Sequence, residues 1–213
     1  MTTPLIPDYL MEYLDSLVPA RPAEMQAMEA HAREINFPII GPTCGYLCYQ
    51  VARLIDAKRI FELGSGYGYS TAWFAKAVRE NGGGEVFHVV WDEELSQQAR
   101  QHLAALDYDG MIRYHVAEAV QTLRDTPGPF DLIFNDINKD GYAASLPVIA
   151  EKLRPGGVLI VDNMLWSGRV FEKGDKSPET ASIRKLTELL THSPDWIVSL
   201  APVRDGVVVA YKR

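Results

Sequence analysis

The sequence predicts an α/β protein built on a doubly wound, mostly parallel sheet. Strand-like and helix-like patterns alternate from residue 59 to residue 190, the order that buries a parallel sheet between two layers of helices. Three glycines at alternate positions separate the first strand from its helix. Two apolar segments near the end of the chain predict an antiparallel hairpin at the sheet edge. With 213 residues, 47% of them hydrophobic, we expect residues 1–213 to form a single domain.

Residues 1–35 are expected to form a helical extension before the sheet. Prolines at positions 4, 7, 19 and 22 divide this extension. Apolar residues recur at helical spacing within 8–14, and a second helix is expected to open at Arg21-Pro22 and to run to about Glu34. In this position the helices would either cover an active site or form a dimer contact, and the sequence leaves both alternatives open.

The rest of the chain supplies the sheet and its helices. Short apolar runs predict the strands, and glycine or proline punctuates the segments between them. The expected strands are 59–63, 85–90, 111–116, 130–135 and 158–161, with the closing hairpin at 196–200 and 207–211. The expected helices are 45–57, capped by Thr43, then 71–80, 93–106, 119–124, 142–153 and 179–190. We expect turns at 81–84 and 154–157, and an irregular segment over 164–178.

The glycine turn after the first strand indicates a ligand site. Gly64, Gly66 and Gly68 allow a positive φ and a close approach of the backbone to a ligand, which is more than a plain tight turn requires. A dinucleotide fingerprint would place its third glycine at Tyr69, so NAD is the weaker interpretation. The pattern that begins at Glu62 resembles the first motif of S-adenosylmethionine (SAM)-dependent methyltransferases, and a carboxylate is tolerable beside that cationic ligand.

The net charge and the cysteine content limit which partners and which compartment are expected for the protein. The net charge of −7 argues against a broad nucleic-acid or anionic membrane surface. No apolar run reaches the length of a membrane span, and the first four residues show no start of a signal peptide. Cys44 and Cys48 lack the partners of a zinc site, so we expect two buried thiols. A cytoplasmic location is the default for such a chain.

Polar residues that follow the fourth and fifth strands are the candidates for chemistry. Asp136 and Lys139 follow the strand at 130–135, and Asp162 and Asn163 follow the strand at 158–161. In an open α/β sheet, ligands bind beyond the carboxyl ends of the strands. Two carboxylates and an amide oxygen there are hard donors, which suit Mg²⁺, with Mn²⁺ and Ca²⁺ as alternatives. Any of these residues alone would be an ordinary turn or cap residue.

Three stretches together look like the cation-dependent small-molecule O-methyltransferases, which include catechol and caffeoyl-coenzyme A O-methyltransferases. The stretches are 130–139, 153–157 and 162–170, and Asp205-Gly206 matches the family's closing motif. The resemblance covers about residues 36–213. It implies a Rossmann-like SAM methyltransferase sheet, SAM as cofactor and a divalent cation, Mg²⁺ first.

The resemblance also implies roles for single residues. Asp136, Asp162 and Asn163 match the metal ligands, Lys139 matches the lysine proposed as general base, and Trp166 matches a residue at the acceptor pocket. The residues that match cofactor-binding positions are Ile40, Glu62, Gly64, Ser65, Gly68, Ser70, Glu118 and Asp136. The alternative for Trp166 is that it packs locally within a loop.

One position departs from the family pattern. Members carry an acidic residue at the end of the second strand to hold the ribose, whereas this chain has Val90 there. Asp92 would take over this role after a small shift of the chain. The alternative is that Asp92 stands at a helix N-terminus, where negative charge is favourable.

The sequence therefore predicts transfer of a methyl group from SAM to a hydroxyl of a small, catechol-like or caffeoyl-type acceptor, with a divalent metal. Two alternatives stay open: O-methylation of hydroxylated uridine in transfer RNA, and a non-catalytic module that binds SAM or a nucleotide. By resemblance, the chain is expected to form a homodimer.

Overall fold

A computed structural model describes residues 6–213, so the predictions that fall on residues 1–5, Pro4 among them, lie outside it. Its sheet has seven strands in the order β3-β2-β1-β4-β5-β7-β6. The strands are β1 (Arg59–Leu63), β2 (Glu85–Val90), β3 (Ile112–Val116), β4 (Phe130–Asn135), β5 (Leu153–Val161), β6 (Trp196–Ala201) and β7 (Val207–Lys212). The first five pair in parallel, which confirms the predicted doubly wound sheet.

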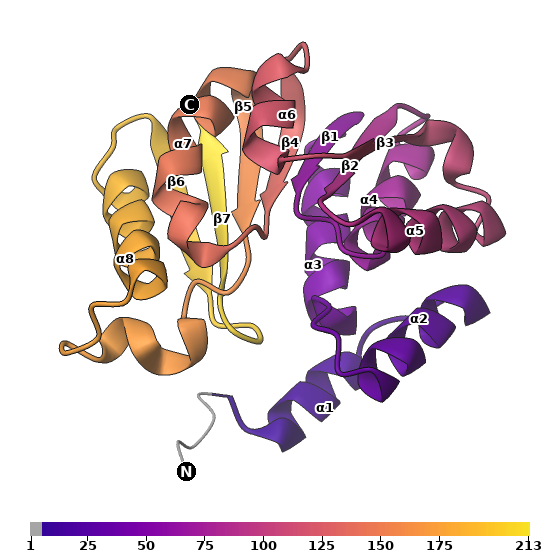
Figure 1. Ribbon diagram of the computed structural model, residues 1–213, viewed down its shortest axis with the longest axis horizontal. Coiled ribbons are helices and arrows are strands. Elements are labelled where there is room, and N and C mark those ends of the chain that lie inside the picture. The colour runs from indigo at the N-terminus through magenta and orange to yellow at the C-terminus, as the bar shows by residue number, and fades with distance from the viewer. Residues whose placement is uncertain (1–5) are drawn as a thin grey trace.

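Helices cover both faces of this sheet (Figure 1). They are α1 (Asp8–Ser16), α2 (Ala23–Glu34), α3 (Gly41–Leu54), α4 (Tyr69–Glu80), α5 (Glu93–Ala105), α6 (Ala119–Asp125), α7 (Tyr142–Lys152) and α8 (Pro178–Thr191). Alternate strand residues face opposite layers, because side chains in a strand have a period of two. Ile60 joins the core under α3, α4 and α5, whereas Phe61 joins the core under α6, α7 and α8.

The closing hairpin completes the sheet. Strand β7 pairs antiparallel with both β5 and β6, so the last strand of the chain lies inside the sheet and β6 forms its edge. The predicted antiparallel pair at this side of the sheet is confirmed. Because the connection between β6 and β7 turns back beside the carboxyl end of β5, residues 202–206 reach the end of the sheet where ligands bind.

The N-terminal helices lie at that same end of the molecule. Figure 1 shows α1 and α2 together, away from the C-terminus to which β7 runs. Helix α2 buries Met25 and Met28 in the core, which anchors it. Helix α1 has no buried residue, and Tyr9 and Tyr13 remain largely exposed.

Two local predictions are wrong. Thr43 does not cap a helix at residue 45, because α3 already begins at Gly41 with Pro42 in its first turn, and the Thr43 hydroxyl donates instead to Asp15. Residues 154–157 are not a turn between elements but the start of β5, where the pairing with β4 shifts register between Phe130 and Leu132. The sequence Pro155-Gly156-Gly157 is therefore accommodated within β5 as an irregularity of the strand pairing.

Two other observations concern the cysteines and the possibility of a membrane-spanning helix. Cys44 and Cys48 are both buried and unbridged, as expected. Among residues 6–213, no helix combines the length and the apolar character needed to cross a bilayer.

Candidate active site

A pocket of about 710 Å³ opens at the carboxyl ends of the central strands. The sequence-predicted residues on its walls are Gly64, Asp136, Lys139, Asp162, Asn163 and Trp166. Apolar side chains, among them Phe37, Val89 and Leu95, form much of the rest. A pocket of this size at this place in the sheet suits a nucleoside-containing ligand together with a small second molecule.

Gly64 packs the glycine turn directly against Asp136. The φ of Gly64 is +90°, and a Cβ atom there would stand 2.5 Å from the backbone oxygen of Asp136. The backbone N–H of Asp136 donates to the carbonyl of Leu63 at 2.8 Å. Only glycine allows both this φ and this approach, so the cofactor turn and the first candidate metal ligand share one rigid piece of backbone.

A smaller cavity of about 40 Å³ adjoins the main pocket. Ile40, Ser65 and Ser70 line it, together with Gly64 and Asp136. Ser65 also joins two strand ends: its N–H donates to the Val89 carbonyl at 3.0 Å, and its hydroxyl accepts from the Val89 N–H at 2.9 Å. Five of the predicted cofactor-binding residues therefore line one continuous region.

Glu62 lies behind this cavity and is completely buried. Its Oε1 accepts a hydrogen bond from the Thr71 hydroxyl, and its Oε2 has no partner within residues 6–213. Burial raises the pKa of Glu62 to about 8, although the hydroxyls of Ser70 and Thr71 oppose the shift. A buried carboxyl with a free oxygen can satisfy that oxygen with a cationic or hydrogen-donating ligand.

Asp136 and Lys139 form an ion pair at the pocket wall. Lys139 Nζ lies 2.6 Å from Asp136 Oδ1 and 3.3 Å from the carbonyl of Ile137. Removal from bulk water raises the pKa of Asp136, and the Lys139 charge opposes this rise. The short connection between β4 and α7 holds both groups at the carboxyl end of β4.

Asp162 and Asn163 extend the same polar surface from β5. Asp162 is 1% exposed, and its Oδ2 lies 3.3 Å from Nη1 of Arg204, while its Oδ1 has no partner in the described chain. Burial first, and then the neighbouring Asp136 carboxylate, raise the pKa of Asp162 to about 6. The Asn163 amide donates to Asp205 at 3.4 Å.

These donors fit a divalent cation. The unsatisfied Oδ1 of Asp162, the Asp136 carboxylate and the Asn163 amide oxygen are the hard ligands that Mg²⁺ and Mn²⁺ prefer. Within residues 6–213, no three His, Cys, Asp or Glu side chains are grouped to hold a metal, and the Asn163 oxygen would be the third protein ligand beside the two carboxylates.

Four predicted cofactor residues line neither cavity: the buried Glu62, Gly68, Asp92 and Glu118. Asp92 caps α5 by accepting from the N–H groups of Glu94 and Leu95, and Glu118 caps α6 by accepting from Val120 and Gln121. Gly68, with φ +92°, precedes α4, and a Cβ atom there would lie 3.0 Å from Cβ of Ala99. The carboxylates of Asp92 and Glu118 thus already satisfy helix N-termini, the alternative considered for Asp92.

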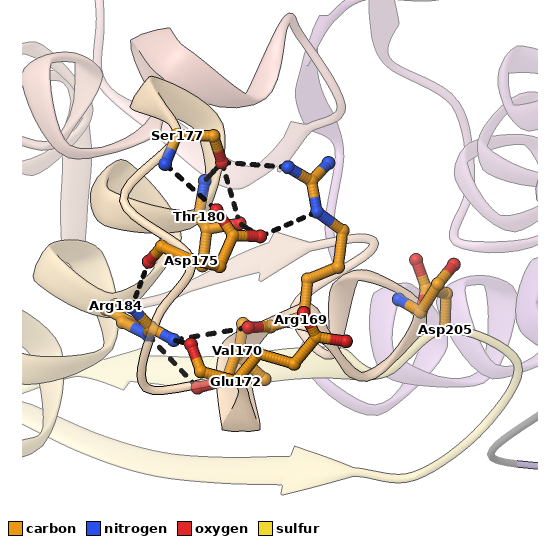
Figure 2. Close-up of polar contacts among 9 residues, drawn as sticks. Arg169, Val170, Glu172, Asp175, Ser177, Thr180, Arg184 and Asp205 are labelled. Atoms are coloured by element: carbon orange, nitrogen blue, oxygen red, sulfur yellow. Dashed lines mark hydrogen bonds and ion pairs between the residues drawn. The ribbon is translucent and has the colours of Figure 1, made fainter. Parts of the chain in front are cut away.

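Trp166 lies on the pocket wall at the start of the short kinked segment η3 (Trp166–Phe171). Figure 2 shows how α8 holds the chain that follows: the Arg184 guanidinium donates to the carbonyls of Arg169, Val170, Glu172 and Asp175, at 2.6–3.2 Å. Arg169 adds an ion pair to Asp175 at 2.8 Å. Apart from η3, residues 164–177 form no helix or strand, as expected, and the Arg184 guanidinium holds this irregular segment against α8.

We expect Arg184→Gln to destabilise the protein by about 2–4 kcal/mol, because charge-assisted hydrogen bonds to four carbonyls are lost. Backbone amides of residues 166–177 should exchange faster in deuterium-exchange mass spectrometry. Lys185→Gln is the matched control, since among residues 6–213 the Lys185 amine on the same helix pairs only with the exposed Glu188. Equal exchange in Arg184→Gln and in the wild type would contradict this role.

Sequence reasoning missed Arg204. This residue follows β6 in the connection to β7, has φ +55° and lines the pocket beside Asp162. A basic residue before Asp-Gly in a turn normally faces solvent, so the local pattern did not indicate that Arg204 lines the pocket. Its closeness to the Asp205-Gly206 motif was the one available signal.

Comparisons with known proteins agree with this geometry. The model of a family described as O-methyltransferase matches residues 23–213. A catechol O-methyltransferase of Niastella koreensis is 26% identical over 184 residues, 84% of this chain and 82% of the relative. One of Mycobacterium tuberculosis is 29% identical over 183 residues, with the same coverage. The solved O-methyltransferase TomG of Streptomyces achromogenes, involved in tomaymycin synthesis and bound to SAM, has a TM-score of 0.86 at 26% identity over 96% of each chain.

Proposed function

The chain belongs to the O-methyltransferase family, and on this premise we propose that it methylates a hydroxyl of a small, catechol-like or caffeoyl-type acceptor in a divalent-metal-dependent reaction. SAM is the methyl donor of this family member, as the interpretation of the glycine turn predicted. The acceptor, the metal and the roles of single residues are the parts we propose.

One observation carries the proposal. The glycine turn, the Asp136–Lys139 pair and the Asp162–Asn163 pair meet in one pocket together with Trp166. An acceptor there would lie between the cofactor turn and a set of groups able to bind and deprotonate vicinal hydroxyls. A nucleotide-binding module without catalysis has no need for this second set of groups.

In this proposal Lys139, in its neutral form, takes the proton from the acceptor hydroxyl. The oxygen then forms a bond to the methyl carbon as the carbon–sulfur bond of SAM breaks, and neutral S-adenosylhomocysteine leaves. Rigid backbone around Gly64 and Asp136 aligns the cofactor with the acceptor, which supports an in-line transfer. Trp166 supplies a flat apolar wall for an aromatic ring.

Asp136, Asp162 and Asn163 would hold the divalent cation, which, when bound, lowers the pKa of an acceptor hydroxyl and orients it. Two adjacent hydroxyls on one ring are the ligands that best match such a site. This chemistry favours catechols over simple phenols.

We also propose that residues 1–213 act as one domain, in the cytoplasm and as a homodimer. The family match over most of the chain supports the single domain. The free thiols of Cys44 and Cys48 are consistent with a reducing compartment. Exposed apolar side chains on α1, among them Tyr9 and Tyr13, offer a surface for a second copy.

Methyl transfer from labelled SAM to caffeic acid, with Mg²⁺ and then with EDTA, tests the proposal. We expect turnover with Mg²⁺ and a rate at least about 10²-fold lower with EDTA, because a bound cation would activate and orient the acceptor hydroxyl. Equal rates under both conditions would contradict metal dependence. SAM binding without any turnover would reject catechols, and the next acceptor to assay is transfer RNA with hydroxylated uridine.

A further inference from the structure

We propose that Arg204 is a built-in competitor of the divalent cation: its guanidinium occupies Asp162 in the metal-free protein and weakens cation binding there. The inference rests on the proposed metal site and adds a residue that controls it. It predicts that a neutral side chain at position 204 raises the affinity for the cation.

The contact between the two residues carries the inference. Nη1 of Arg204 lies 3.3 Å from Oδ2 of Asp162, a carboxylate that is 1% exposed. No other ion pair to Asp162 occurs within the described residues, so Arg204 is its main positive neighbour. A buried carboxylate is costly without a counter-charge, which explains why the guanidinium is held there.

Arg204 reaches this position from a fixed turn. Gly206 packs so closely against Leu165 that a Cβ atom there would stand 2.4 Å from the Leu165 side chain. The Asp205 carboxylate accepts from the Ser167 N–H at 2.6 Å, and the Leu165 N–H donates to the Asp205 carbonyl at 2.8 Å. These contacts tie the connection between β6 and β7 to the segment after β5.

The two candidate metal-binding carboxylates are each paired without a metal. Asp136 pairs with Lys139 and Asp162 pairs with Arg204, while Asp140 and Glu179 also line the pocket. A divalent cation on these carboxylates would face both side-chain cations across a few ångströms of partly buried space. The Arg204 guanidinium keeps its charge and is the group held on Asp162, so a cation that binds Asp162 must displace it.

Titration with Mn²⁺, followed by the electron paramagnetic resonance signal of the free ion, tests this role in the intact protein without any acceptor. We expect Arg204→Gln to bind Mn²⁺ at least about tenfold more tightly than the wild type, since a full charge is removed a few ångströms from the site. Arg204→Lys, which keeps the charge, should remain within about threefold of the wild type on the same grounds. Arg204 has φ +55°, and because neither glutamine nor lysine is β-branched, both variants place a similar demand on this backbone.

Thermal unfolding in EDTA gives a second readout. Arg204→Gln should lower the Tm without metal, because Asp162 loses its counter-charge, and Mn²⁺ should restore it more than in the wild type. If Arg204→Gln fails to fold, Arg204→Asn, which tolerates a positive φ better, replaces it.

Equal Mn²⁺ affinity in wild type and Arg204→Gln would overturn the inference, and so would the absence of binding in both. Adding Asp162→Asn to Arg204→Gln should remove the gained affinity, and if that gain persists, the competition is not at Asp162. Because the titration contains no acceptor, its result can be interpreted even if the caffeic acid assay shows no turnover.

Discussion

Replacing Lys139 with arginine is expected to lower kcat by about 10²–10⁴-fold, the range for loss of a general base. Arginine keeps the positive charge beside Asp136, which lies 2.6 Å from the Lys139 amine. A guanidinium does not release its proton near neutral pH, so it cannot accept one from the acceptor. Initial rates with caffeic acid and isothermal titration with SAM are the measurements, and the SAM affinity should remain near the wild-type value.

The control separates the base from a general effect of charge or folding. Lys76→Arg changes a lysine that pairs with Glu80 on α4, away from the pocket, and should keep the wild-type rate. Lys139→Met removes both charge and base and should be at least as slow as Lys139→Arg. A Lys139→Arg enzyme with wild-type kcat would show that the residue acts by charge alone, contrary to the proposed mechanism.

Gly64→Ala is expected to destabilise the protein by about 2–5 kcal/mol, the sum of left-handed strain and overpacking. The new Cβ atom would stand 2.5 Å from the Asp136 carbonyl oxygen, where only backbone could yield. Asp136 and the turn would move apart, so both SAM affinity and kcat should fall at least about tenfold, as expected when reacting groups are misplaced by an ångström or less. Urea unfolding and SAM titration are the measurements.

Gly82→Ala is the matched control for this variant. Gly82 also has a positive φ, +95°, but a Cβ atom there would meet nothing within 4 Å. The control should therefore cost only the backbone strain, about 1–2 kcal/mol, and should leave SAM binding unchanged. If Gly64→Ala resembles Gly82→Ala in every measurement, the close packing of the turn against Asp136 contributes neither to stability nor to SAM binding.

Much of the architecture was predictable because it depends on local patterns. Apolar runs such as 59–63 and 130–135 coincide with β1 and β4, and the alternation with helices predicted the parallel sheet. The family interpretation and the SAM-dependent O-methyltransferase activity are likewise confirmed by the comparisons. The errors at Thr43 and at 154–157 arose where α3 could start one turn earlier and where a bulge kept glycines in a strand.

The candidate site was predictable in part. The rule that ligands lie at the carboxyl ends of strands placed Asp136, Lys139, Asp162 and Asn163 together, and all four line one pocket. Their roles as base and metal ligands stay predictions until the variants are measured. Asp92 and Glu118 each cap the helix that follows, and their contacts with the cofactor stay predictions as well.

The sequence by itself determined the order of strands and helices, the glycine turn and the polar residues at the strand ends, because each depends on neighbours a few positions away. Only the tertiary structure decided that Gly64 packs on Asp136, that Arg184 anchors residues 169–175, and that Arg204 meets Asp162 across 42 positions of the chain. The contacts of Gly64 and Arg204 join elements that are distant in sequence, and their geometry depends on how β1, β4, β5 and β7 lie side by side in the sheet, which no local pattern encodes. The Arg184 contacts join α8 to the segment just before it, and they depend on how that segment folds back onto the helix.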